Sequence, residues 1–168
     1  AVVGYGLSKF GERWEAGLKE LVSEAAVAAI NNAGIESKEI QSLFTGSMSS
    51  GRFANQEHLG ALVADQLGLI PIPSVRVEAA CASGGLALRQ AFFDILSGQH
   101  DIVIAMGVEK MSDLGGFAVT RALVSAAHSE WEGFFGATFP GLYAMIARLH
   151  MHKYGTTREQ MALCAVKN

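Results

Sequence analysis

Cysteine, proline and charge are scarce in this sequence. Its 168 residues include two cysteines and three prolines, and charged residues make up 17% of the chain, with a formal net charge of -3. Two cysteines cannot build the disulfide framework of a small secreted protein, which favours a reducing compartment and a free thiol. No basic run is present, so the sequence offers no electrostatic footprint for nucleic acid or for an anionic membrane.

Long apolar runs are also missing, although half of the residues are hydrophobic. Glycine, serine or a charged residue interrupts each apolar stretch well before membrane-spanning length, and no basic-then-apolar leader precedes Val2. We therefore expect a soluble cytoplasmic protein with a proper hydrophobic core. Its expected partners are small molecules or other proteins, with no nucleic acid and no membrane.

The apolar residues alternate between strand-like runs and helical periodicity. Strands are predicted near residues 1–7, 42–46, 74–78 and 101–109, and helices near 17–33, 56–67 and 82–96. The first and second helices end at Gly34 and Gly68, as helices with a glycine cap do. This β-α-β-α-β-α-β order with short connections predicts an α/β layered domain, a mostly parallel sheet with helices on both faces.

Beyond residue 112 the pattern is less regular. The segment 112–141 is rich in Gly, Ser, Thr and aromatic residues, which predicts a long functional loop without clear elements. A helix is expected at about 142–153. A last helix is expected from Thr156, because Thr156 and Glu159 match a capping box. This helix reaches Asn168 without a Gly, Pro or turn signal, which predicts a missing remainder.

Cys81 lies where the third predicted strand ends and a glycine-rich apolar helix begins. The start of a helix carries partial positive charge and unpaired N–H groups, which favour a thiolate and can hold a developing oxyanion. The helix at 82–96 is apolar around most of its girth, so we expect it to be buried on more than one side. Cys81 would then lie in a dry interior reached by a channel. The alternative is a buried structural cysteine.

Other candidate residues carry weaker signals. Cys164 has no nearby base or glycine turn and is interpreted as inert packing. His150 and His152 point to different helix faces, unlike the i, i+4 pair of a zinc helix, so no metal site is expected. The segment Gly4-Tyr5-Gly6 lacks the third glycine of a dinucleotide fingerprint, because Lys9 stands in its place. The isolated histidines are assigned surface or structural roles: His58, His100 and His128.

Three stretches, taken in order, resemble the thiolase superfamily and most closely its archaeal and sterol-carrier types. They are Val77-Glu78-Ala79-Ala80-Cys81-Ala82-Ser83-Gly84-Gly85, Met106-Gly107-Val108-Glu109-Lys110-Met111-Ser112, and Thr138-Phe139-Pro140-Gly141-Leu142-Tyr143 followed by Tyr154-Gly155-Thr156-Thr157-Arg158-Glu159-Gln160. The resemblance implies the N-terminal half of a layered fold made of two similar halves. It implies a core at 1–111, a CoA-facing loop domain at 112–155, and a helix returning to the core at 156–168.

In that family, the cysteine matching Cys81 attacks an acyl-CoA thioester, and the carbanion of a second acyl-CoA then attacks the acyl-cysteine. The resemblance therefore implies an acyltransferase that condenses two acyl-CoA, acetyl-CoA to acetoacetyl-CoA, or runs the reverse thiolysis. It implies the N–H of Cys81 as an oxyanion donor, and Thr138 and Phe139 as residues near CoA. CoA is part of the substrate, so no cofactor is expected. The resemblance favours a structural role for Glu109 over that of a general base.

The family's activating histidine, in Gly-His-Pro, and its second cysteine, in Cys-x-Gly, lie in the C-terminal half, and neither motif is present here. We therefore expect this chain alone to be acylated without completing the condensation. The resemblance implies a homo-oligomer, a dimer or tetramer through the strand at 74–78, and a need for the C-terminal half. Small acyl-CoA-binding proteins are further partners known with archaeal thiolases. Without the second half, the helix at 82–96 should be exposed and drive association.

Two alternatives stay open at this point. A hydroxymethylglutaryl-CoA synthase or a ketoacyl synthase shares the fold and the cysteine, although the stretch from Met106 to Ser112 favours a thiolase. A non-catalytic thiolase-like scaffold subunit is the second alternative. Basic residues that are candidates for CoA phosphates, with a solvated face as the other interpretation of each, are Arg121, Arg148, Lys153 and Arg158.

Overall fold

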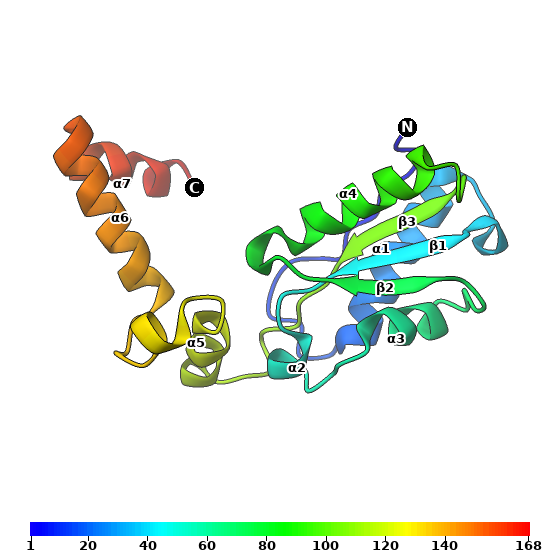
Figure 1. The fold of residues 1–168 in the computed structure, drawn as a ribbon, viewed down its shortest axis with the longest axis horizontal. Helices are drawn as coiled ribbons and strands as arrows, with labels where there is room; N and C mark the ends of the chain where they lie inside the picture. Colours follow the sequence, from blue (N-terminus) through cyan, green and yellow to red (C-terminus); the bar gives the residue numbers. More distant parts are fainter. The chain divides into compact units, whose positions relative to one another are not determined.

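The computed structural model describes all 168 residues and divides the chain into two compact units, Ala1–Gly115 (unit 1) and Gly116–Asn168 (unit 2). Figure 1 shows the elements of each unit. Unit 1 contains α1 (Leu18–Ala33), η1 (Ser37–Glu39), β1 (Ser42–Gly46), α2 (Ser50–Phe53), α3 (Leu59–Gln66), β2 (Ser74–Val77), η2 (Ala80–Ala82), α4 (Ser83–Leu96) and β3 (Val103–Gly107). Unit 2 contains α5 (Gly116–Val124), η3 (Ser129–Gly133), α6 (Phe139–Tyr154) and α7 (Arg158–Lys167).

Unit 1 is built on a three-stranded parallel sheet in the order β2-β1-β3. Phe44 of β1 aligns with Val75 of β2 and with Ala105 of β3. Helices α1 and α3 lie on one face of the sheet and α4 lies on the other (Figure 1). The predicted α/β class, with a parallel sheet and helices on both faces, is confirmed.

The alternating side chains of β1 determine which helix packs on which face, because successive residues of a strand point to opposite sides. Leu43 is fully buried and packs in the main core with Val22 of α1 and Leu59 of α3. Its neighbour Ser42 points the other way and donates a hydrogen bond to the carboxylate of Asp94 in α4. The core of unit 1 therefore lies between the sheet and α1 with α3.

The buried strand expected at residues 1–7 is wrong. This segment pairs with no strand and instead follows α1, where the N–H of Tyr5 donates to Asn32 Oδ1 at 3.1 Å. A Cβ added to Gly6 would lie 2.0 Å from the carbonyl oxygen of Ala25, so only glycine allows this approach. The Gly-x-Gly sequence is thus a packing motif against a helix. The apolar side chains beside it are exposed: Val2, Val3, Tyr5 and Leu7.

Helix α4 is buried on one side only. Ala87 and Ala91 are buried and Leu86 is half-buried, whereas the other large apolar side chains of the helix are exposed. They are Leu88, Phe92, Phe93, Ile95 and Leu96. The expectation that this helix is buried on more than one side is therefore wrong for this chain. The expectation that it is exposed without a second half is confirmed.

Unit 2 is helical where a long loop was expected. The helix α5 and the single π-helical turn η3 occupy much of the segment 112–141, so the expectation of no clear elements is wrong. The last helix begins after Thr157, whose Oγ1 accepts from the N–H of Gln160 at 3.3 Å, so the capping box predicted at Thr156 is displaced by one residue. None of the helices of the chain combines the length and hydropathy that a membrane span requires.

Candidate active site

Cys81 is the central residue of η2, between the end of β2 and the start of α4. Its predicted position at a strand-to-helix junction is confirmed. The side chain of Cys81 is exposed, so a dry interior reached by a channel is wrong for this chain. The physical reason is that no element of unit 1 covers the outer face of α4, at whose start Cys81 lies.

The turn that presents Cys81 has an unusual backbone. Ala80 has a φ angle of +46°, in the left-handed region that L-residues other than Gly, Asn and Asp rarely adopt. The Oγ of Ser83 holds this turn from inside, because it accepts from the N–H of Ala79 at 2.9 Å and donates to the carbonyl of Ala80 at 2.7 Å. Such backbone strain of about 1–3 kcal/mol persists where the surrounding structure enforces it, and it is common at active sites.

The backbone N–H of Cys81 forms no hydrogen bond within the chain. The neighbouring N–H of Ala82 is engaged with the carbonyl of Ala79 at 2.9 Å, and that of Ala80 with the carboxylate of Glu78. An exposed thiol and an unengaged N–H thus belong to the same residue. This pair can attack a carbonyl carbon and donate to the oxygen on which negative charge develops.

Glycines bring the first turn of α4 against the ends of the strands. A Cβ added to Gly46, the last residue of β1, would lie 2.4 Å from the carbonyl oxygen of Ser83. A Cβ added to Gly107, the last residue of β3, would lie 3.7 Å from the Cα of Gly84. The carboxyl ends of the two strands therefore support the helix start that follows Cys81.

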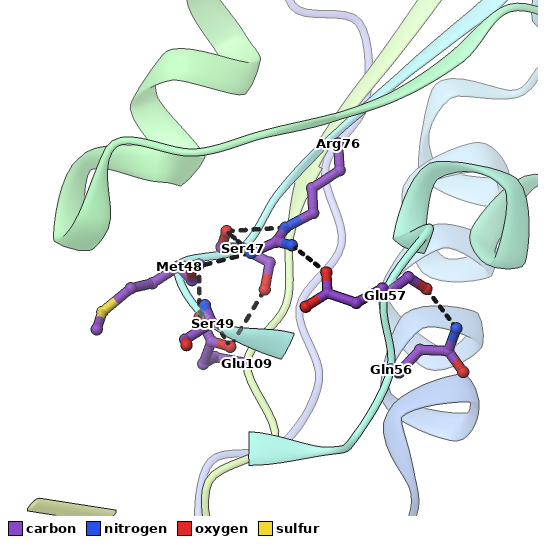
Figure 2. Close-up of polar contacts among 7 residues, drawn as sticks. All are labelled: Ser47, Met48, Ser49, Gln56, Glu57, Arg76 and Glu109. Atoms are coloured by element: carbon purple, nitrogen blue, oxygen red, sulfur yellow. Dashed lines mark hydrogen bonds and ion pairs between the residues drawn. The ribbon is translucent and has the colours of Figure 1, made fainter. Parts of the chain in front are cut away.

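The loop Ser47–Ser49 after β1 is held by two charged side chains (Figure 2). The carboxylate of Glu109 accepts from the N–H of Met48 at 2.7 Å and from the Oγ of Ser47 at 3.1 Å. The guanidinium of Arg76 donates to the carbonyl of Met48 at 2.9 Å and to that of Ser47 at 3.2 Å. We call Arg76, Glu109 and the loop Ser47–Ser49 the strand-end clamp.

Glu109 thus has the contacts of a structural carboxylate, as the resemblance favoured over a general base. Arg76 and Ser47 were not identified from the sequence. Their partners lie far along the chain, and a lone arginine in a strand gives no signal of the loop that it will meet. The stretch from Met106 to Ser112 was the only sequence signal that marked part of this network.

Thr138 and Phe139 belong to unit 2, whereas Cys81 belongs to unit 1. Thr138 caps α6, since its Oγ1 accepts from the N–H of Gly141 at 3.3 Å. Phe139 begins that helix and its ring lies 6.3 Å from the ring of Tyr143, centroid to centroid. Their role beside CoA stays a prediction.

The remaining candidates have local contacts. Cys164 is exposed on α7, so its interpretation as packing is wrong for this chain. His150 Nδ1 lies 3.0 Å from the Oγ1 of Thr156. His100 Nδ1 lies 2.9 Å from a carboxylate oxygen of Asp94, which is a structural role for this histidine.

Comparisons with known proteins identify the family of the chain. The family model described as "Thiolase, N-terminal domain" matches residues 1–168. This chain belongs to that family. The thiolase N-terminal domain chain is 52% identical over 168 residues to an acetyl-CoA acetyltransferase of Methanothermobacter thermautotrophicus, and 51% identical over 166 residues to one of Methanocaldococcus jannaschii.

These alignments cover 100% and 99% of this chain but 43% and 42% of the two relatives, so the chain spans less than half of their length. A solved structure of an acetyl-CoA acetyltransferase from Syntrophomonas wolfei is 24% identical, with a TM-score of 0.70 over 99% of this chain and 44% of that chain. That likeness supports the fold. The resemblance to the thiolase superfamily is confirmed.

Proposed function

We propose that this thiolase N-terminal domain supplies the nucleophile and one oxyanion donor of a thiolase-type acyl transfer. The observation that carries the proposal is that the thiol and the unengaged N–H of Cys81 meet at one strained strand-to-helix turn. Membership of the thiolase family and the acetyl-CoA acetyltransferase names of the two archaeal relatives support acetyl-CoA as the substrate.

In the proposed first step, the thiolate of Cys81 attacks the carbonyl carbon of the thioester. A new bond forms from Sγ to that carbon while the N–H of Cys81 donates to the oxygen, which carries the negative charge. The bond from carbon to the CoA sulfur then breaks, leaving an acyl-cysteine and a CoA thiolate that takes up a proton. One well-placed donor of this kind contributes about 10²- to 10³-fold in rate.

The proposed second step needs a base that removes an α-proton from a second acyl-CoA. The sequence contains no Gly-His-Pro and no Cys-x-Gly motif. We therefore assign acylation to this chain, and completion of the Claisen condensation or of the reverse thiolysis to the chain together with a C-terminal thiolase half. CoA takes part only as substrate, and the exposed outer face of α4 supports packing against such a half or within a homo-oligomer.

Acylation is tested by incubating the chain with acetyl-CoA and locating any added acetyl group by peptide mass spectrometry. We expect acetylation of Cys81, its loss in Cys81→Ala, and no effect of Cys164→Ala, which removes the other exposed thiol. Formation of acetoacetyl-CoA by the chain alone would contradict the division of labour between the two steps.

A non-catalytic scaffold role is the second candidate, and the exposed apolar face of α4 favours it. The same experiment separates the two functions. Resistance of Cys81 to both acetyl-CoA and iodoacetamide would overturn the enzymatic proposal and support the scaffold.

A further inference from the structure

The strand-end clamp holds its loop by opposite charges on opposite backbone groups. The carboxylate of Glu109 accepts hydrogen bonds from the N–H of Met48 at 2.7 Å and from the N–H of Ser49 at 3.4 Å. The guanidinium of Arg76 donates to carbonyl groups of the same loop, including that of Met48 at 2.9 Å. Hydrogen bonds with one charged partner are shorter and stronger than neutral ones. The loop after β1 is therefore fixed in position and in orientation.

The clamp joins the carboxyl ends of all three strands. Arg76 lies in β2, Glu109 follows the end of β3, and the loop that they share follows β1. Backbone hydrogen bonds continue the connection: the N–H of Ser47 donates to the carbonyl of Val77 at 3.2 Å, and the N–H of Val108 donates to that of Gly46 at 3.0 Å. The positions of these strand ends are thus mutually dependent.

The same strand ends determine where Cys81 lies. The chain passes from Arg76 to Cys81 within five residues, and Val77, bound by Ser47, is the last strand residue before that turn. On the other side of Cys81, the carbonyl of Ser83 rests against Gly46. The turn with Cys81 is therefore anchored before and after by groups that the clamp holds.

The exposures of the charged groups suit this role. The side chain of Arg76 is 22% exposed and its outer edge pairs with Glu57, which is 74% exposed, at 2.8 Å. An exposed ion pair alone contributes little to stability. The five hydrogen bonds between the loop and the side chains of Arg76 and Glu109, at 2.7 to 3.3 Å, instead define a geometry. The strained φ of Ala80 needs surroundings that enforce it.

We propose that Glu109 and Arg76 are positioning residues, which act through the loop Ser47–Ser49 to fix the turn that presents the thiol and N–H of Cys81. This inference rests on the proposed function of Cys81. Neither residue touches the reacting atoms. Their effect is on the orientation of the nucleophile and of the oxyanion donor, where small displacements have large effects on rate.

The test compares the rates at which iodoacetamide alkylates Cys81 and Cys164 in the same 168-residue chain, both of which are exposed. In the wild type, we expect Cys81 to react severalfold faster than Cys164. Glu109→Gln keeps the size of the side chain and removes its charge, and Arg76→Lys keeps the charge and removes the fork that binds two carbonyls. We expect each to bring the Cys81 to Cys164 rate ratio down toward 1, and to lower acetylation by acetyl-CoA in parallel.

Val22→Ala is the control for loss of stability, because Val22 is buried in the apolar core of the same unit and takes no part in the hydrogen bonds of the clamp. We expect it to lower the melting temperature at least as much as Glu109→Gln while leaving the rate ratio within about twofold. Should Glu109→Gln fail to fold, Ser47→Ala removes a single hydroxyl bond to the carboxylate and should lower the ratio about threefold.

The outcomes separate this inference from the proposed function. Resistance of Cys81 to both iodoacetamide and acetyl-CoA in the wild type would overturn both. Alkylation of Cys81 no faster than that of Cys164, with acetylation of Cys81 intact, would overturn the positioning role alone. A reactive Cys81 whose rate ratio is unchanged by Glu109→Gln and Arg76→Lys would overturn the positioning role alone. The same result follows if Val22→Ala lowers the ratio as much as they do, because stability would then account for the effect.

Discussion

The two units differ in what holds them together. Every buried apolar side chain of the chain lies in unit 1, apart from Ala122. In unit 2, α6 and α7 bury no residue, and most of their large apolar side chains are exposed. Unit 1 is therefore stabilised by burial between distant segments, whereas unit 2 relies on contacts within and between neighbouring helices.

The polar contacts follow the same division. Lys110 in unit 1 is 3% exposed, and its ammonium donates to the carbonyl of Arg13 at 2.7 Å, which ties the end of β3 to the N-terminal segment. In unit 2, the side-chain hydrogen bonds join residues at most six positions apart, such as Thr138 with Gly141 and His150 with Thr156. Unit 1 can therefore hold a nucleophile in a fixed geometry, since its anchors come from several strands.

The largest difference between the units should appear on truncation of core residues. Leu43 is fully buried, so Leu43→Ala should lower the free energy of unfolding of unit 1 by about 3 kcal/mol. Leu149 of α6 is 63% exposed, so Leu149→Ala should cost less than about 0.5 kcal/mol. Urea unfolding of unit 1, followed by the fluorescence of Trp14 in a Trp131→Phe background, measures the first effect.

The corresponding measurement for unit 2 uses Trp131 in a Trp14→Phe background. Equal losses of stability from Leu43→Ala and Leu149→Ala would show that burial does not distinguish the two units.

Glycine substitutions test a second difference between the units, beginning with Gly46, which packs against the first turn of α4. Gly46→Ala places a Cβ 2.4 Å from the carbonyl oxygen of Ser83, where only backbone can yield, and should cost about 2 kcal/mol. Gly116→Ala in unit 2 meets no atom within 4 Å and should change stability by less than about 1 kcal/mol, in the stabilising direction. Urea unfolding curves of the two variants check both, and a Gly46→Ala curve that matches the wild type would contradict the close packing.

A smaller effect is expected where Asp94 ties α4 to the sheet. Burial raises the pKa of the Asp94 carboxyl, but hydrogen bonds from Ser42 and His100 and the charge of His100 outweigh burial and hold this pKa below its ordinary value. A lowered pKa means that the folded state binds fewer protons than the unfolded state. The resulting stability is present above about pH 4 and is lost as the pH falls through the lowered pKa.

Asp94→Asn should therefore lower the free energy of unfolding by about 1–2 kcal/mol at pH 7, through loss of hydrogen bonds to a charged group. It should also flatten the dependence of stability on pH below about 4. Asp101→Asn, at an exposed carboxyl nearby in sequence, is the matched control and should do neither. An unchanged acid slope in Asp94→Asn would show that another carboxylate governs acid unfolding of unit 1.

The elements of unit 1 could be predicted where periodic burial determines them. The helical repeat that places Leu18, Val22, Ala26 and Ile30 on one buried face gave α1 with its glycine cap. The apolar runs gave β1, β2 and β3 within a few residues. The strand predicted at residues 1–7 is wrong because an apolar run forms a strand only if another strand pairs with it. Here Gly4 and Gly6 allow the backbone to pack against α1 instead.

The candidate site, too, could be predicted from the sequence only in part. Cys81 could be placed at a helix start from its neighbours in sequence alone. The strain at Ala80 could not be predicted in this way, because alanine has no preference for positive φ. The turn is imposed by Ser83 and the adjoining strands. The contacts of Arg76 with Met48 and of Glu109 with Met48 join residues 28 and 61 positions apart, so they depend on strand order. No local pattern determines that order.

The smallest predicted effect concerns the cap of α7, where the sequence favoured Thr156 and the structure uses Thr157. Thr157→Ala removes the oxygen that accepts from the N–H of Gln160 and should destabilise α7 by about 1 kcal/mol. Thr156→Ala, the neighbouring control, loses only the contact with His150 and should cost less. Amide hydrogen exchange within α7 measures both changes, and stronger loss of protection in Thr156→Ala would reverse the assignment. Because unit 2 is held by local contacts, neither variant should shift the unfolding transition that Trp14 reports for unit 1.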